Sequence, residues 1–124
     1  MKKDLILILD AAILTTEIAS VVAGDKFSTQ IDGDTIYVQK IDSTDNSAVI
    51  EIECNCHDFY RYEDLEFVLI KNLIPHAQMV YLRFRDQLFA ADVSLKIQES
   101  FKTILDDDHG KTTYKGENLL EISH

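Results

Sequence analysis

Apolar positions near the start of the chain recur with the spacing of a helix. Within residues 5–22 they fall every three or four positions up to Ile13, and polar residues such as Glu17 take the other side. This period predicts a helix that ends near Gly24, because glycine commonly follows the last helical turn. The run 5–9 taken alone would equally suit a strand, since it is apolar at every position.

The next segment alternates with period two, which is typical of strands. Asp32-Gly33 is a preferred two-residue turn, because both of its central positions need a positive φ. This turn predicts a hairpin that pairs Phe27 with Val38, Thr29 with Ile36, and Ile31 with Asp34. A third strand is expected over residues 48–55, where one apolar face alternates with a polar face.

A second helix is expected over residues 62–74, with Leu65, Leu69 and Leu73 on one face and Pro75 as its stop. Residues 79–93 then resemble a second hairpin around Asp86-Gln87. A last helix is expected to begin at Ser94, a common capping residue, and to reach about residue 105. The final fourteen residues suit either a short strand over 119–122 or a loose tail.

Together these elements predict one α+β domain over residues 1–124. Their order is α-βββ-α-ββ-α, which favours two layers: an antiparallel sheet with helices on one face. A chain of 124 residues that is 46% hydrophobic is long and apolar enough for one packed core.

The charge narrows the choice of partners. The chain has 22 acidic and 12 basic residues, a formal net charge of −10. Such a surface repels nucleic acids and anionic membranes, so neither is expected as a partner, and a basic protein is the natural complement. The apolar run near the N-terminus is interrupted by Asp4, Asp10 and Glu17, which argues against a signal peptide or a membrane span.

The two cysteines are Cys54 and Cys56. Residues two apart on a strand point the same way, and their spacing of about 6.5–7 Å is too long for an easy disulfide. Reduced thiols favour a cytoplasmic protein. With His57 they could form part of a zinc site, but a second ligand pair is lacking, so buried structural cysteines are preferred and no metal is expected.

Other candidate chemistry is sparse. Asp106, Asp107 and Asp108 with His109 could hold a cation, although their spacing is not that of a calcium loop, and a solvated helix end is preferred. The chain has no nucleophile elbow, no phosphate-binding glycine loop and no zinc-protease motif. We therefore expect no catalytic residues, no enzyme activity and no cofactor.

The polar face of the predicted sheet is the candidate binding surface. Tyrosine and arginine are enriched at the centres of protein interfaces. The candidate partner-binding residues are Tyr37, Glu51, Glu53, Tyr81, Arg83 and Arg85. A simpler interpretation is an ordinary wet sheet face on which Glu51 and Glu53 pair with Arg83 and Arg85.

The predicted element order resembles that of class I type III secretion chaperones and YbjN-like proteins. The segments that carry the resemblance are 27–38, 62–74, and 79–93 with the helix that follows, and Asn72 matches an asparagine of those families. Ala23-Gly24 stands where a leucine-glycine step would be expected. The resemblance covers residues 5–105 and implies a homodimer that holds an extended segment of a partner, without catalytic residues.

Three functional hypotheses follow. The first is an acidic, non-catalytic protein-binding module, either chaperone-like or immunity-like, which would hold or neutralise one partner protein. The second is a small-molecule binder or enzyme with a pocket between helices and sheet. The third is a structural subunit that assembles only with itself.

Overall fold

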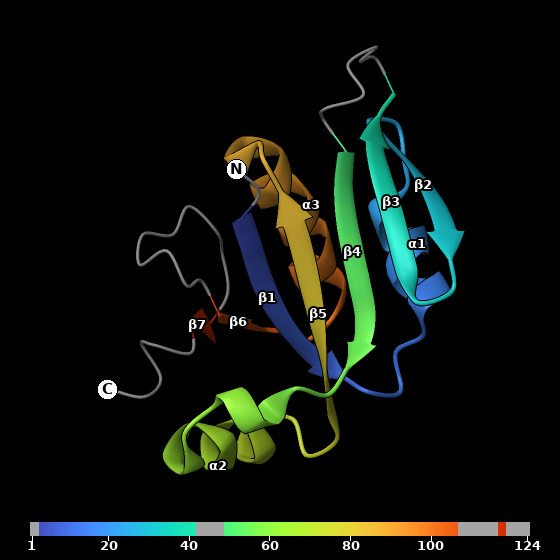
Figure 1. Cartoon of the computed structure of the whole chain (residues 1–124). Helices are drawn as coiled ribbons and strands as arrows, with labels where there is room; N and C mark the ends of the chain where they lie inside the picture. The colour runs from blue at the N-terminus through green and yellow to red at the C-terminus, as the bar shows by residue number, and fades with distance from the viewer. Residues whose placement is uncertain (1–2, 42–48, 107–116, 119–124) are drawn as a thin grey trace.

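A computed structural model describes residues 3–41, 49–106 and 117–118. Its sheet has seven described strands in the order β2-β3-β4-β5-β1-β6-β7 and is antiparallel except between β6 and β7 (Figure 1). The strands are β1 (Lys3–Asp10), β2 (Phe27–Asp32), β3 (Thr35–Lys40), β4 (Val49–Cys56), β5 (Ala77–Phe84), β6 (Ile104–Asp106) and β7 (Glu117–Asn118). The helices are α1 (Thr15–Val22), α2 (Asp64–Leu73) and α3 (Gln87–Ser100), with a 3-10 turn η1 (Phe59–Arg61) before α2.

Helices α1 and α3 cover one face of the sheet and enclose the larger core. Leu5, Leu7 and Leu9 of β1 pack there with Ile18 of α1 and Ile97 of α3. These side chains are essentially inaccessible to water, and burying each one stabilises the fold by about 1.5–3 kcal/mol. The predicted α+β class, with helices packed on an antiparallel sheet, is confirmed.

Helix α2 packs on the opposite face, which the sequence pattern did not indicate. Its buried Ile70, with Ile74 after its end, contacts Ile6 and Ile8 of β1 and Met79 of β5 in a second, smaller core. Figure 1 shows α2 at one end of the sheet, while the face over β3 and β4 has no helix in front of it. Five of the six candidate binding residues lie on or beside that uncovered region, on β3, β4 and β5.

The expected first helix over 5–22 is wrong in its first half. Residues Lys3–Asp10 form β1, a central strand between β5 and β6, and only Thr15–Val22 is helical. Odd positions of this strand face the larger core and even positions face the smaller one, so the apolar run is buried on both sides. A strand covered on both faces is continuously apolar, and such a run cannot be distinguished from a helix by its period.

The first hairpin is confirmed, with its turn one residue later than expected. Gly33 and Asp34 connect the strands, Gly33 has φ of 63°, and Asp32 pairs with Thr35. Each residue of β2 therefore faces a partner two positions further along than predicted, for example Ile31 opposite Ile36. A shift of two leaves every side chain on its expected face, because the side-chain period of a strand is two. The third strand is confirmed as β4.

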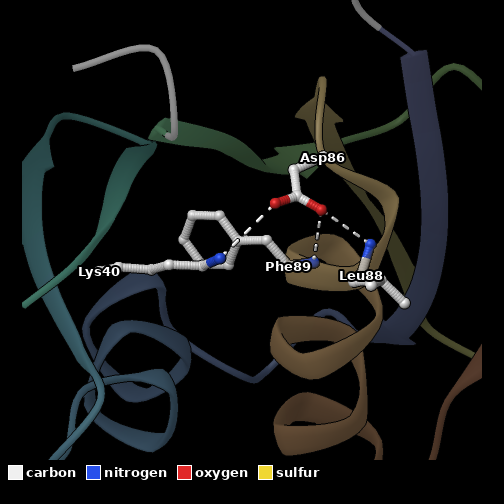
Figure 2. A network of polar contacts seen from close by, with 4 residues as sticks. All are labelled: Lys40, Asp86, Leu88 and Phe89. Atoms are coloured by element: carbon white, nitrogen blue, oxygen red, sulfur yellow. Dashed lines mark hydrogen bonds and ion pairs between the residues drawn. The ribbon is translucent and has the colours of Figure 1, made fainter. Parts of the chain in front are cut away.

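The second hairpin is wrong. Residues 79–84 belong to β5, which pairs with β1 and β4, and α3 follows directly from Gln87. Asp86 caps this helix by accepting hydrogen bonds from the backbone N–H groups of Leu88 and Phe89 (Figure 2). The hairpin was one of the segments that carried the resemblance to secretion chaperones, so that support is lost.

The bounds of the last helix and of the strand after it also differ from the predicted ones. Ser94 is not a cap; it is buried inside α3, where its Oγ accepts a hydrogen bond from Nε2 of Gln98 at 2.6 Å. The helix ends at Ser100, and Ile104 and Leu105 belong to β6. The helix expected over 62–74 is confirmed as α2. The strand suggested for 119–122 lies outside the described residues.

Candidate functional site

The sheet register places five of the six candidate residues side by side. Tyr37 of β3 lies opposite Glu51 of β4, which lies opposite Arg83 of β5. In the next row Glu53 of β4 lies opposite Tyr81 of β5. Three neighbouring strands thus bring two tyrosines, two carboxylates and one guanidinium onto the uncovered face.

These residues surround a shallow depression of about 150 Å³, and Thr35 completes its lining. A second depression of about 460 Å³ adjoins it over β2 and β3, and Tyr37 lines both. Because Tyr37 lines both depressions and is 37% exposed, its ring is accessible from either one. We define the open sheet face as the residues that line these two depressions. These residues are Ser28, Thr29, Gln30, Thr35, Tyr37, Gln39, Val49, Glu51, Glu53, Tyr81 and Arg83.

Arg85 does not belong to this surface. It follows the last residue of β5 and is exposed beyond the end of the strand. Arg83 lies opposite Glu51, and its Nε also lies 3.2 Å from Oδ1 of Asp4 on β1. Arg83 is thereby tied to the neighbouring strand, which limits the positions its guanidinium can take.

Tyr81 is fixed in a similar way. Its hydroxyl donates a hydrogen bond to Oδ2 of Asp58 at 3.2 Å, and its ring packs on the smaller core. Glu53 is exposed and Glu51 is half-buried, so both carboxylates remain in contact with water. The arrangement offers groups for recognition by charge and by aromatic contact.

A bulge in β4 separates the two cysteines. Glu53 pairs with Tyr81 but Cys56 pairs with Met79, so one extra residue lies between them on β4, and Asn55 takes φ of 58°. Cys54 therefore enters the larger core while Cys56 packs against the smaller one. The expectation that both thiols point the same way is wrong, because a bulge interrupts the alternation of faces.

Both thiols are held in their protonated form by their surroundings. Burial raises the pKa of Cys54 to about 12, and burial together with the nearby Glu53 and Asp58 carboxylates raises the pKa of Cys56 to about 11. The thiolate is the nucleophile and the metal ligand, so neither cysteine is activated for such chemistry.

Gln78 is a structural residue that the sequence pattern did not single out. It is 1% exposed, and its side chain makes three hydrogen bonds to backbone groups. Its Oε1 accepts from the N–H of Asn55 at 2.8 Å, and its Nε2 donates to the carbonyls of Asp10 and Ile13 at 3.0 and 2.8 Å. A signal was present, because Gln78 occupies the same alternating positions as the apolar Val80, Leu82 and Phe84.

Residues 3–41, 49–106 and 117–118 contain no cluster of three or more histidine, cysteine or acidic side chains arranged to hold a metal ion. Asp106 is buried and accepts a hydrogen bond from the hydroxyl of Tyr62 at 2.8 Å, which connects β6 to the start of α2. Its expected companions Asp107, Asp108 and His109 lie outside the described residues.

Among the described helices, none has the length and apolar character needed to cross a membrane. Comparison of the chain with protein-family models, with curated proteins and with solved structures finds no match.

Proposed function

We propose that this chain is a non-catalytic, cytoplasmic protein-binding module that holds or neutralises one partner protein on its open sheet face. The observation that carries the proposal is the convergence of Tyr37, Glu51, Glu53, Tyr81 and Arg83 from three adjacent strands around one depression that none of the described helices covers. Tyrosine and arginine supply large contact areas with polar ends, which is why they dominate many interface centres.

The partner is proposed to be basic. Glu51 and Glu53 lie near the middle of the open sheet face, and Arg83 already has Asp4 beside it, so acidic groups predominate there. The net charge of −10 adds a long-range attraction that would speed association with a positively charged surface. The same charge disfavours nucleic acid and anionic membranes. An immunity-like protein that covers the basic surface of a toxin would fit this chemistry.

The test is a charge reversal with a matched control. Glu51→Lys with Glu53→Lys changes the net charge by +4, and Asp25→Lys with Glu99→Lys makes the same change in the α1–β2 connection and on α3. The first pair of substitutions, but not the second, should lower the affinity for a basic partner at least tenfold, about 1.4 kcal/mol. The partner would be identified by crosslinking or from a neighbouring gene. Circular dichroism and chemical unfolding would show that both variants fold.

Equal losses of affinity in both double variants would assign the effect to net charge alone and contradict a defined site. Binding unchanged by the first pair and by salt would remove the open sheet face as the docking surface. Screened attraction should weaken from low to physiological ionic strength, where the Debye length is about 8 Å.

A second mode, the holding of an extended apolar segment as a secretion chaperone does, has its own observation. Leu65 and Val68 lie three residues apart on α2 and are 65% and 52% exposed, and Tyr60 before them is 87% exposed. Residues three apart on a helix share a face, so this is an apolar strip next to the solvent. Leu65→Ser with Val68→Ser would abolish binding in this mode and spare it in the first. The homodimer that such a chaperone would form can be checked by light scattering.

A further inference from the structure

A third cavity lies at the end of the molecule where α2 packs against the sheet. Its volume is about 360 Å³, within the range of small-molecule sites, which starts near 300 Å³. Phe59, Phe67, Ile70 and Ile74 provide its apolar lining. The rings of Phe59 and Phe67 lie 5.9 Å apart at 57°, so two aromatic surfaces meet in one wall.

The polar side chains that the described residues contribute to this cavity are basic. His57, Lys71 and His76 belong to its lining, and no described aspartate or glutamate does. That composition contrasts with the whole chain, in which acidic residues outnumber basic ones by 22 to 12. The nearby Asp58 carboxylate accepts a hydrogen bond from Tyr81 on the uncovered part of the sheet.

Two of the basic groups have positions set by other contacts. Nζ of Lys71 lies 5.1 Å from the centroid of the Phe67 ring, a cation–π distance that holds the ammonium beside the aromatic wall. Nε2 of His57 lies 3.0 Å from Oδ1 of Asn55, on the bulge that ends β4. Both residues are exposed and both line the cavity, so water and a ligand can reach them.

We propose that this cavity is a binding site for a small organic anion with a flat apolar body, such as an aromatic monocarboxylate. The aromatic wall and the two isoleucines would take the ring, while Lys71, with His57 and His76, would donate charge-assisted hydrogen bonds to the carboxylate. This site is separate from the open sheet face, and the proposal does not depend on the partner-binding function.

Three probes that share a benzyl group and differ in charge test it: phenylacetate, phenylacetamide and benzylamine. Each is titrated into the full chain and followed by calorimetry and by the imidazole NMR signals of His57 and His76. Phenylacetate should bind with a dissociation constant below about 10 mM, and at least tenfold more tightly than the neutral amide. Benzylamine, which places a cation against basic groups, should bind most weakly.

Variants connect the selectivity to the residues. Lys71→Gln should reduce the affinity for phenylacetate at least threefold and leave that for phenylacetamide unchanged, whereas Lys26→Gln, the same change in the α1–β2 connection, should alter neither. Phe67→Leu should weaken both probes. Equal affinity for all three probes would overturn the proposal in favour of an unselective apolar slot. Absence of any phenylacetate effect on the two imidazoles at about 10 mM would also overturn it.

Discussion

Nζ of Lys40, at the end of β3, lies 3.5 Å from Oδ2 of Asp86, the N-cap residue of α3 (Figure 2). The other carboxylate oxygen of Asp86 accepts hydrogen bonds from the N–H groups of Leu88 and Phe89 at 3.0 and 3.2 Å. The Lys40 ammonium also lies 4.9 Å from the centroid of the Phe89 ring. One aspartate thus caps a helix and connects it to a strand of the sheet that the helix covers.

Two substitutions of Asp86 should separate these contributions. Asp86→Ala removes the cap and the charge, and we expect a loss of about 1–2 kcal/mol in the free energy of unfolding, mostly from the cap. Asp86→Asn keeps a capping oxygen and should lose about 0–1 kcal/mol, because the ion pair is half exposed. Urea unfolding of the two variants measures the difference. Equal losses would mean that the ion pair, and not the cap, dominates.

Substitution of Gln78 should be among the most damaging single polar changes in the chain. Gln78→Leu would leave the N–H of Asn55 and the carbonyls of Asp10 and Ile13 without their partner in a buried site. Each unsatisfied buried group costs about 1–3 kcal/mol, so we expect a loss of about 2–4 kcal/mol after partial relaxation. Gln39→Leu, on the open sheet face, is the matched control and should change stability by less than about 0.5 kcal/mol. A Gln78→Leu loss no larger than the control's would contradict the assigned role.

The bulge at Asn55 can be tested with two variants that both remove the side-chain amide. Asn55 has φ of 58°, a conformation that glycine adopts freely and alanine adopts at a cost. We expect Asn55→Gly to be more stable than Asn55→Ala by about 1 kcal/mol, measured by chemical unfolding. The opposite order would indicate that the β4 backbone is not held in the left-handed region.

The cysteine thiols should make stability fall at alkaline pH. Their folded-state pKa values of about 12 and 11 lie above the ordinary value of 9.0, so the folded chain holds these protons more tightly than the unfolded chain. The contribution is complete below pH 9 and is lost as pH rises through 9 toward 11 and 12. The stability difference between wild type and Cys54→Ala should therefore shrink from pH 8 to pH 10.5.

Thiol labelling gives an independent check of the same burial. At pH 8 Cys54 should react with a thiol reagent only as fast as the chain opens, since it is 2% exposed and protonated. Denaturant should restore the rate of a free cysteine. Labelling of native Cys54 at the rate of a free thiol would show that it is not enclosed in the larger core.

Turns, strands and helix ends could be predicted from the sequence where a single residue type or a short repeat determines the local backbone conformation. Gly33 permits the positive φ of the first hairpin, so the turn was found to within one residue. The alternation through Ile50, Ile52 and Cys54 placed β4, and Pro75 marked the end of α2 to within two residues. Five of the six candidate binding residues also share one surface as expected, because alternation alone assigns side chains to faces.

Other features depended on contacts between distant parts of the chain. The run 5–9 became a strand because β5 and β6 pair with β1 on either side, and helices cover both of its faces. Residues 87–93 became helical although their alternation suited a strand, and Phe89 of this helix stacks on Phe27 of β2 at 5.2 Å. That distant contact leaves no trace in the local period, whereas Asp86, a residue type favoured at helix N-caps, was a local signal for the helix.

The α+β class, the first hairpin and the polar face over β3 and β4 could be predicted from local residue patterns, since they follow from backbone preferences and from the two-residue repeat of a strand. The remaining features were set by the tertiary fold. It placed α2 on the opposite face, turned Cys56 away from Cys54 through one extra residue, and brought His57, Lys71 and His76 around one cavity. These outcomes depend on which surfaces come together when the chain folds, because burial of apolar surface stabilises long-range contacts that no short segment of the chain contains.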